Sequence, residues 1–238
     1  MKKYMLATDL DGTLVGDGDA LKELLEFFES LPYKVDLVYI TGRHYDSALS
    51  LIDSERLPIP SILVTDVGTS IYSGRELLRD PKWEQKVREN WNPHRIREIA
   101  LQLPGIRLQT LPHERRVSFF VNDSEGASNL RQKLKESGIP HTFVFSSGRD
   151  VDVLPESAGK GKALQYIVEE YAGEEANILV AGDSGNDLDM LTLGYPAVIV
   201  GNAQKELLDV KSDHIFTATK ACAGGIQQAW DHYYGAKI

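Results

Sequence analysis

Cysteine is almost missing from this sequence. Cys222 is the only one among 238 residues, which excludes a disulfide within the chain and a thiolate metal cluster. Long apolar runs are missing too, since none approaches the roughly 20 residues that cross a bilayer. The two lysines at the start resemble those of a secretion signal, but the apolar run behind them stops at Asp9. We therefore expect a cytoplasmic protein that does not enter a membrane.

Positive charge is also scarce. The sequence holds 26 Lys and Arg against 35 Asp and Glu, which leaves a net charge of −9. This balance argues against a nucleic-acid-binding protein that relies on a basic surface. Apolar residues make up 42% of the chain, enough for a substantial core. The length suits one large domain, or a main domain with a smaller one inserted.

Five short apolar runs predict buried strands. They are rich in β-branched or aromatic residues and are almost continuously apolar, which is typical of parallel strands covered on both faces. The runs are Tyr4–Thr8, Val35–Ile40, Ile62–Thr65, Ile178–Ala181 and Ala197–Val200. Helical patterns separate them. The alternation predicts a doubly wound α/β domain with a parallel, Rossmann-like sheet.

Two of the helical patterns lie beside residues that can begin or end a helix. Asp19 is placed to cap a helix over Ala20–Ser30. Gly173 follows a stretch with one apolar face at helical spacing, where a helix is expected to end. That face consists of Leu164, Ile167, Val168 and Tyr171.

The middle of the chain has a different charge balance. Residues 82–157 hold 12 Lys and Arg against 10 Asp and Glu, a balance of +2 that leaves −11 for the rest. Helices are predicted at Pro81–Asn90, at Pro93–Gln102 with Asn92 as cap, and near Ser124–Ser137. The runs "RRVSFFV" and "HTFVFSS" can add a small sheet. We predict a catalytic core formed by 1–80 and 158–238, with a smaller α+β domain inserted at 81–157.

Polar and acidic side chains follow four of the predicted core segments. The first strand leads into "DLDGT", the second into "TGR", the third into "TDVG" and the fourth into "GDSGND". Ligands of an open parallel sheet bind beyond the carboxyl ends of its strands, so these groups are expected to share one site.

A divalent cation would resolve the repulsion among the acids at that edge. Asp9, Asp11, Asp183 and Asp187 would raise one another's pKa if gathered there. Mg²⁺ prefers carboxylate oxygens together with water and phosphate, and it would leave one carboxylate free to attack a phosphoryl group. Lys160, at a predicted helix start, can neutralise phosphate charge.

Together these motifs resemble those of the haloacid dehalogenase-like phosphatases. "DLDGT", "TGR", "GKGKAL" and "GDSGND" match the four motifs of that superfamily, in order. The resemblance implies that Asp9 is the nucleophile that forms an aspartyl-phosphate. It implies that Asp11 protonates the leaving sugar oxygen and then activates water.

The resemblance also assigns the phosphate and metal ligands. Thr41, the amide of Gly42, Asn186 and Lys160 would bind the phosphate. The Mg²⁺ ligands would be Asp9, the carbonyl of Asp11 and Asp183, with Asp187 supporting Lys160 or a metal-bound water.

Further segments are similar to the sucrose-phosphate phosphatase branch of the superfamily. They are "VGTSIY", "WEQKVRENW", "FSSGRDVDVLP", "GKGKALQYI" and "GDSGNDLDML". In that branch the insertion is a cap that closes over the sugar. Two positions depart from the branch pattern: Arg116 stands where a lysine is usual, and "ACAGG" replaces a histidine-containing segment. They leave the identity of the sugar open.

Several residues have competing interpretations. Lys162 is the rival of Lys160 for the phosphate, although the "KGxAL" pattern favours Lys160. Asp66 can be either a functional residue or a turn residue after the third strand. For Arg43, pairing with acids of the core and the absence of such a pair are both open. In the loop "SSGRDVD", we expect at least one of Ser147, Arg149 and Asp150 to bind sugar hydroxyls, with Asp152 a weaker candidate.

The sequence therefore predicts a Mg²⁺-dependent sugar phosphatase that acts on a disaccharide phosphate such as sucrose 6-phosphate. Mannosylfructose phosphate, a glycosyl phosphoglycerate and a hexose phosphate are alternative substrates. A non-catalytic sugar-phosphate-binding module is a further alternative, but such a module should have lost a nucleophile, lysine or metal ligand. A glycosyltransferase that supplies the substrate is the expected partner.

Overall fold

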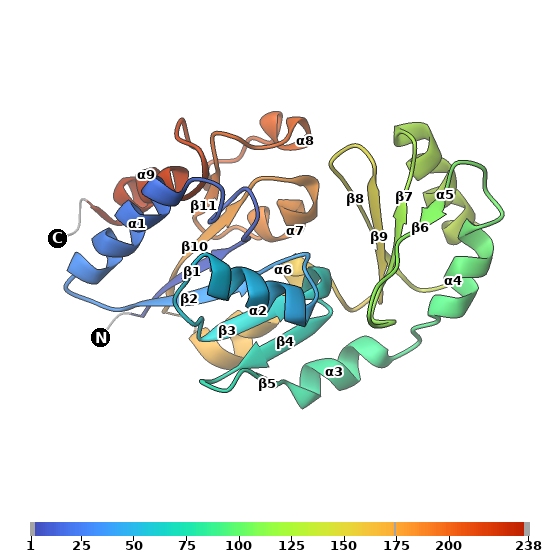
Figure 1. Cartoon of the computed structure of the whole chain (residues 1–238), viewed down its shortest axis with the longest axis horizontal. Helices are drawn as coiled ribbons and strands as arrows, with labels where there is room; N and C mark the ends of the chain where they lie inside the picture. Colours follow the sequence, from blue (N-terminus) through green and yellow to red (C-terminus); the bar gives the residue numbers. More distant parts are fainter. Residues whose placement is uncertain (1–2, 174, 236–238) are drawn as a thin grey trace.

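The computed structural model describes residues 3–173 and 175–235, and its larger sheet has eight strands in the order β12-β11-β10-β1-β2-β3-β4-β5 (Figure 1). The pairs from β12 to β3 are parallel, and β4 and β5 continue the sheet in antiparallel fashion. The strands are β1 (Tyr4–Thr8), β2 (Val35–Ile40), β3 (Ile62–Thr65), β4 (Ser70–Ser73), β5 (Leu78–Arg79), β10 (Asn177–Gly182), β11 (Ala197–Ile199) and β12 (Ile215–Thr217). The five strands expected from the sequence are all present, with bounds that differ by at most one residue at either end.

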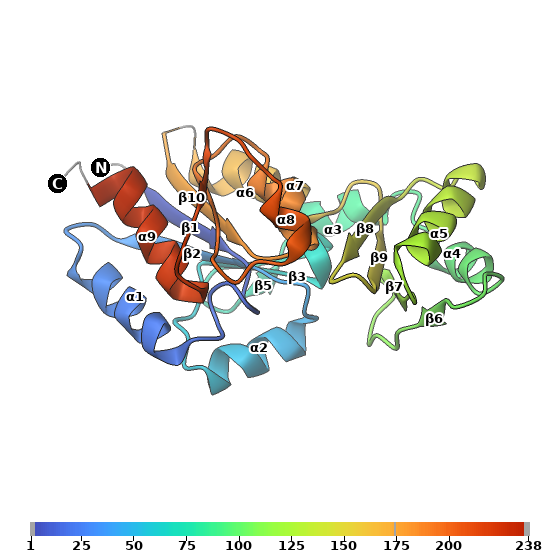
Figure 2. The same ribbon diagram turned by 90° about the horizontal axis from the view of Figure 1, so that it is seen from above.

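Helices cover both faces of this sheet (Figure 2). One face packs against α1 (Gly18–Ser30), α2 (Tyr45–Ser54) and α9 (Cys222–Tyr234). The other packs against α3 (Pro81–Arg88), α6 (Lys160–Ile167), α7 (Leu188–Leu191) and α8 (Lys205–Leu208). Residues of β1 alternate between the two, with Leu6 in one apolar cluster and Met5 and Ala7 in the other. The arrangement confirms the doubly wound α/β fold.

Two helix boundaries differ from the sequence-based expectation. Asp17, not Asp19, caps α1, because its side chain accepts the amide of Ala20 at 3.1 Å and the helix already begins at Gly18. Asp19 lies in the first turn, where its charge favours the helix dipole. The helix that was expected to reach Tyr171 changes after Ile167 into the wider turn η2 (Val168–Ala172), and the chain leaves it at Gly173 with φ +81°.

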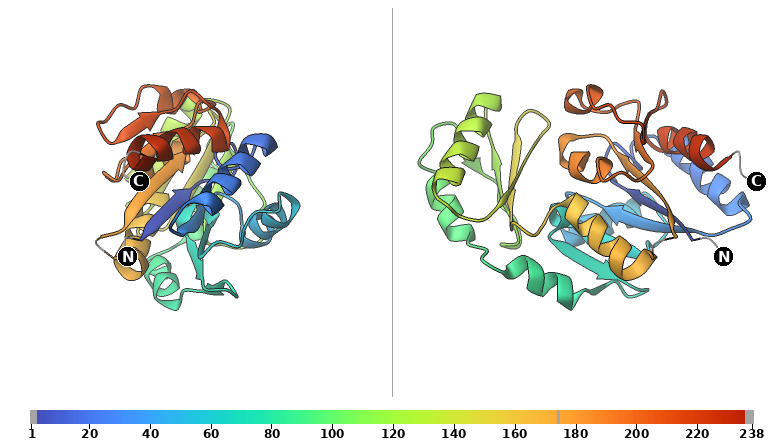
Figure 3. Two further views of the ribbon diagram at one scale, coloured as in Figure 1. Left: turned by 90° about the vertical axis from the view of Figure 1, so that its left-hand side faces the viewer. Right: turned by 180° about the vertical axis from the view of Figure 1, so that it is seen from behind.

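The inserted segment forms a second, four-stranded antiparallel sheet in the order β6-β7-β9-β8. Its strands are β6 (Arg107–Leu108), β7 (Val117–Phe120), β8 (Thr142–Ser146) and β9 (Asp150–Leu154). Helices α4 (Pro93–Ala100) and α5 (Ser124–Glu136) cover one face over an apolar cluster of its own. The opposite face is turned to the larger domain (Figure 3). Because β9 begins at Asp150, much of the segment expected to be a polar loop belongs to this sheet.

Helix α3 joins the two parts. Its apolar residues Trp83 and Val87 are buried in a cluster of the larger domain, and the indole N–H of Trp83 donates to the carbonyl of Gly68 at 3.2 Å. The start of the insertion is therefore fixed on the core sheet, and the small sheet follows from α4 onward.

Within the described residues, no helix combines the length and apolar character that a membrane crossing requires.

Candidate active site

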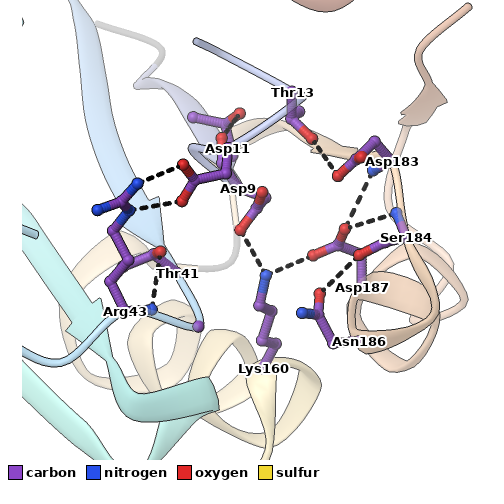
Figure 4. Close-up of polar contacts among 12 residues, drawn as sticks. Asp9, Asp11, Thr13, Thr41, Arg43, Lys160, Asp183, Ser184, Asn186 and Asp187 are labelled. Atoms are coloured by element: carbon purple, nitrogen blue, oxygen red, sulfur yellow. Dashed lines mark hydrogen bonds and ion pairs between the residues drawn. The ribbon is translucent and has the colours of Figure 1, made fainter. Parts of the chain in front are cut away.

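The carboxyl ends of β1, β2 and β10 and the start of α6 meet at one edge of the larger sheet (Figure 4). Asp9 follows β1, Thr41 follows β2, and Asp183 follows β10, while Asp187 ends the short helix η3 (Gly185–Asp187). Lys160 is the first residue of α6. The parallel register places β1 between β2 and β10, so the side chains that follow the three strands face a common space.

Lys160 holds two carboxylates together. Its Nζ lies 2.6 Å from an Oδ1 of Asp9 and 2.6 Å from an Oδ1 of Asp187, and the side chain is fully buried. Burial alone would lower the pKa of Lys160, but Asp187 and Asp9 outweigh it and raise that pKa. The lysine is therefore a fixed positive charge beside Asp9.

Lys162, the rival candidate, lies elsewhere. Its Nζ donates to the hydroxyl of Thr142, 3.0 Å away, and to the carbonyl of Glu156. One residue of separation in a helix turns the side chain by about 100°, so two lysines that are two positions apart point to different sides. The structure brings Lys160 to the acidic cluster, whereas the side chain of Lys162 points from α6 to β8 and to the segment between β9 and α6.

Three buried carboxylates form a group suited to a metal ion. Ligand oxygens of Asp9, Asp183 and Asp187 lie within 4.8 Å of one another. Burial raises the pKa of Asp183 to about 6, and the charge of Asp187 adds to the shift. Burial also raises the pKa of Asp9, against the effect of Lys160. Carboxylates that are reluctant to ionise together and that offer hard oxygen donors fit Mg²⁺.

Asp187 differs from the other two acids because both of its oxygens already have partners. Oδ2 accepts the backbone amides of Asp183 at 3.0 Å and Ser184 at 3.1 Å, and Oδ1 accepts Lys160. Gly182 is required for this arrangement, since a Cβ there would lie 2.5 Å from the Cβ of Asp187. Asp187 thus shapes the loop and orients the lysine, while Asp9 and Asp183 have oxygens turned to the shared space.

Asp11 lies apart from the metal-type group. The guanidinium of Arg43 grips its carboxylate with two bonds, Nε to Oδ2 and Nη2 to Oδ1, both 2.7 Å long. Arg43 is itself held by the hydroxyl of Ser47 at 2.9 Å. The sequence left open whether Arg43 pairs with a core acid, and the structure shows that it pairs with Asp11. Asp11 is half exposed at the mouth of the site.

The groups expected to bind phosphate lie on two facing segments beyond the strand ends: Thr41 and Gly42 follow β2, and Asn186 is in η3. A Cβ on Gly42 would come 3.7 Å from Nδ2 of Asn186, so the loop after β2 faces η3 directly. The hydroxyl of Thr41 accepts the amide of Arg43 at 3.1 Å, and the hydroxyl of Ser184 donates to Asn186 at 3.2 Å. Both loops are thereby set in place by their own side chains.

Arg116, which precedes β7, connects the small sheet to the loop after β2. Its Nη2 donates to the carbonyl of Gly42 at 2.8 Å, and its Nη1 donates to Asp152 at 2.6 Å. Nε lies 3.7 Å from an oxygen of Asp66. Burial raises the pKa of Asp66, and the charge of Arg116 counteracts that rise. Asp66 therefore begins the turn η1 (Asp66–Gly68), as one of the two interpretations expected, and it is also a buried ion-pair partner of Arg116.

The second departure from the family pattern lies behind the first motif. Cys222 has φ +47°, and its Sγ lies 3.5 Å from the carbonyl oxygen of Gly12. Asn202 links the two segments by donating to the same carbonyl at 2.7 Å and accepting the amide of Cys222 at 2.8 Å. Cys222 therefore supports the loop that carries Asp11.

The three candidates in the small domain lie on its β8–β9 hairpin and do not share one environment. The Arg149 guanidinium lies over the ring of Phe120, 5.0 Å from its centre. Asp150 accepts Gln109 at 3.2 Å, and burial raises its pKa. The amide of Ser147 donates to Glu206 of α8 at 3.0 Å. The polar face of the sheet, which includes Ser118, Asp150 and Asp152, faces the core.

Sequence reasoning missed two contacts between the parts of the molecule. It did not connect Arg116 with Gly42, which lies 74 positions earlier, or Ser147 with Glu206, which lies 59 positions later. A sequence signal exists for the first, because an arginine beside "VSFF" departs from the family pattern. We find no sequence signal for the second.

A family model described as sucrose-6F-phosphate phosphohydrolase matches residues 2–234. The chain belongs to this family. It is 33% identical to a probable sucrose-phosphatase of Arabidopsis thaliana over 97% of its own length. It is 31% identical to a mannosylfructose-phosphate phosphatase of Agrobacterium fabrum, covering 96% of both chains.

The solved sucrose-phosphatase of Synechocystis, in complex with sucrose and phosphate, has the same architecture. It superposes with a TM-score of 0.91 at 34% identity and covers 98% of both chains. A sugar phosphatase of haloacid dehalogenase subclass IIB, at 17% identity and a TM-score of 0.70, shares the fold. The chain spans about 60% of the length of the Arabidopsis relative.

Proposed function

We propose that this protein hydrolyses the phosphate monoester of a sugar, through an aspartyl-phosphate on Asp9 and with Mg²⁺ as cofactor. One observation carries the proposal. Lys160 fixes Asp9 at 2.6 Å, at strand ends shared with Asp183 and the loop of Gly42, and the polar face of a second sheet lies opposite. This arrangement provides a nucleophile, a positive charge and amide donors for one phosphoryl group.

In the first step an oxygen of Asp9 attacks phosphorus, and the bond from phosphorus to the sugar oxygen breaks. Asp11 gives its proton to that oxygen, so the sugar leaves as a neutral alcohol. Lys160, Thr41, the amide of Gly42 and Asn186 hold the other phosphate oxygens. For Asp11 to act as the acid, its carboxyl group has to separate from Arg43 and carry a proton, which the second step returns to it.

In the second step Asp11 takes a proton from water, which attacks phosphorus and releases Asp9 and inorganic phosphate. Asp9 and Asp183 would hold a Mg²⁺ ion with the carbonyl of Asp11, and Asp187 would support them from behind. When bound, the ion neutralises charge on the phosphoryl group. Asp187 would meanwhile keep Lys160 pointed at the nucleophile.

Residues 81–157 are proposed as the cap that selects the sugar, over a core formed by 1–80 and 158–238. Sucrose 6-phosphate is the favoured substrate, because the superposition with the sucrose-bound Synechocystis enzyme covers both parts of the chain. Ser147, Arg149 and Asp150 remain candidate sugar ligands. Mannosylfructose phosphate is the second candidate, since the Agrobacterium relative is similar over its whole length.

A substrate panel tests the proposal. Purified protein with MgCl₂ is expected to release inorganic phosphate from sucrose 6-phosphate with a higher kcat/KM than from mannosylfructose phosphate, a glycosyl phosphoglycerate or a hexose phosphate. A reversed order among the sugars would replace the substrate but keep the reaction. If no member of the panel releases phosphate, the enzyme assignment fails and a sugar-phosphate-binding module becomes the better hypothesis.

Replacement of Asp9, the proposed nucleophile, is the control for the phosphate-release assay. Asp9→Asn is expected to remove turnover of every substrate, because an amide cannot form the acyl phosphate. The fold should persist, since the change replaces a buried carboxyl by a neutral group of the same shape. Phosphate release and circular dichroism measure the two effects. Turnover retained by this variant would contradict the assignment of Asp9.

The surroundings of the protein are part of the proposal. We infer a cytoplasmic location from the near absence of cysteine, and a glycosyltransferase as the source of the sugar phosphate. A glucosylglycerol-phosphate synthase of Pseudomonas anguilliseptica is 32% identical over 96% of this chain, and the match covers 30% of the synthase. Co-purification of the protein with a glycosyltransferase from its host tests the second inference.

A further inference from the structure

The tip of the β8–β9 hairpin meets the core at one carboxylate. Glu206 Oε1 accepts the backbone amide of Ser147 at 3.0 Å and the backbone amide of Gly185 at 3.2 Å. Ser147 belongs to the cap, and Gly185 is the first residue of η3, whose last residue is Asp187. One side-chain oxygen thus joins the cap to the loop that carries the proposed metal and phosphate ligands.

The backbone at both amides is shaped for this contact. Ser147 and Gly148 have φ +54° and +67°, a tight turn that directs the amide of Ser147 toward α8. On the core side, a Cβ at Gly185 would lie 2.8 Å from the carbonyl oxygen of Phe145. Only glycine allows the hairpin to approach η3 this closely.

The helix that bears Glu206 is itself anchored to the site. The amide of Gln204, which precedes α8, donates to the carbonyl of Asp183 at 2.7 Å. Leu207 is fully buried in the apolar cluster on that face of the sheet. Glu206 itself is exposed, but the residues on either side of it hold its backbone in place, so its carboxylate reaches Ser147 and Gly185 from a fixed point on the core.

Two of the contacts between cap and core lie at loops beside the candidate active site. Arg116 reaches the carbonyl of Gly42, and the hairpin reaches Glu206 and Gly185. The superposition with the enzyme that holds sucrose and phosphate covers 98% of both chains at a TM-score of 0.91, so cap and core are arranged as in that complex. The contact at Glu206 therefore belongs to an arrangement of cap and core like the one in which that enzyme holds sucrose and phosphate.

We propose that Glu206 is a positioning residue that clamps the β8–β9 hairpin of the cap onto the metal-binding loop, and so sets the affinity for the sugar part of the substrate. The inference rests on the proposed function. Glu206 contacts neither the nucleophile nor Lys160, so it acts through Ser147 and Gly185. A carboxylate that accepts two amides makes stronger bonds than a neutral acceptor, so its charge matters.

Kinetics with two substrates test the clamp. In Glu206→Ala, KM for sucrose 6-phosphate is expected to rise about tenfold, with about a threefold rise in Glu206→Gln, which keeps one acceptor. kcat for p-nitrophenyl phosphate, which carries no sugar, should change less than about twofold in both variants. Glu23→Gln, the same charge change on the exposed surface of α1, is the control and should match the wild type.

The other outcomes count against the clamp. Equal losses for both substrates would indicate a structural effect on the metal loop, and an unchanged KM for sucrose 6-phosphate would show that the contact carries no affinity. Either result overturns the proposal.

Hydrogen exchange supplies a readout that needs no turnover. Peptides over 143–149 and 183–187 are expected to exchange at least about tenfold faster in Glu206→Ala than in wild type, while peptides of α5 stay unchanged. Identical exchange of the hairpin peptide in the two proteins would overturn the clamp even if the enzyme is active. If the wild type hydrolyses no sugar phosphate, the proposed function fails, and the exchange result still decides the clamp.

Discussion

At the scale of single residues, Lys160 explains how three carboxylates can share one buried site. Its ammonium lies between Asp9 and Asp187, both 2.6 Å away, and none of the side chain is exposed. An ion buried this deeply is tolerated because it is paired on two sides. The same charge stands ready for a phosphoryl group once substrate enters.

We therefore expect Lys160→Met to fail in two ways. Phosphate release should fall about 10²–10³-fold, because one of the charges that stabilise the transition state is gone. The metal-free protein should lose about 3–5 kcal/mol of unfolding free energy, since two buried carboxylates lose their partner. Lys162→Met is the matched control and should stay within about twofold of wild-type activity. Equal effects of the two variants would contradict the role of Lys160.

At the scale of elements, α3 is bonded to the core through Asp80, the residue that precedes it and caps its start. Asp80 caps the helix through the amide of Trp83 at 2.8 Å and also accepts the hydroxyls of Tyr166 at 3.0 Å and Tyr171 at 2.5 Å. Burial would raise the pKa of Asp80, but the bonds from Tyr171, Trp83 and Tyr166 outweigh it and hold the pKa below the ordinary value near 3.8. The ionised form is thus the one that stabilises this joint.

The stabilisation that Asp80 provides depends on pH. The contribution of Asp80 is fully present above pH 4 and is lost as the pH falls through its lowered pKa. Asp80→Asn should cost about 1–2 kcal/mol of unfolding free energy at pH 7, with a difference in Tm from wild type that shrinks below about pH 4. Asp123→Asn, which changes the cap of α5, should show little effect at any pH, because asparagine caps equally well.

Thermal unfolding from pH 3 to 7 measures both variants. A difference between wild type and Asp80→Asn that grows on acidification would contradict the assignment of the ionised form.

At the scale of the whole molecule, cap and core are joined through buried charge. Arg116 lies between Asp152 of the cap and Asp66 of the core, and all three side chains are buried. Its second arm bonds the carbonyl of Gly42 in the phosphate loop. The position of the cap is therefore linked directly to the loop that would bind phosphate.

Arg116→Met should leave two buried carboxylates without their cation. We expect a loss of about 3–5 kcal/mol in unfolding free energy and a raised KM for the sugar phosphate. Adding Asp152→Asn to this variant should restore part of the stability, because one uncompensated charge is removed. Denaturant unfolding of the two single variants and the double variant measures this coupling. Strictly additive losses would contradict the ion-pair account.

The site residues that can be predicted from the sequence are those that lie directly at the end of a strand or the start of a helix. Asp9 and Asp11 follow an apolar strand, and Lys160 opens a helix, so each lies at an element end that the pattern itself defines. Parallel strands bring their carboxyl ends to one edge, and this rule alone gathers Asp9, Thr41 and Asp183. The cap of α1 was misplaced, from Asp17 to Asp19, because both residues can cap and only the backbone shows where the helix begins.

The contacts that the sequence could not supply all join distant segments through side chains. Arg43 with Asp11, Arg116 with Gly42, and Glu206 with Ser147 depend on how loops from separate elements pack, and no local spacing encodes that packing. The β9 strand was missed in part because its alternating acidic residues, Asp150 and Asp152, resemble a polar loop until β7 and β8 are placed beside them. The sequence by itself determined the α/β class, the order of the motifs and the chemistry expected at the strand ends, because these follow from hydrophobic periodicity and residue type. Only the tertiary structure decided how the cap meets the core, because that junction consists of long-range ion pairs and hydrogen bonds.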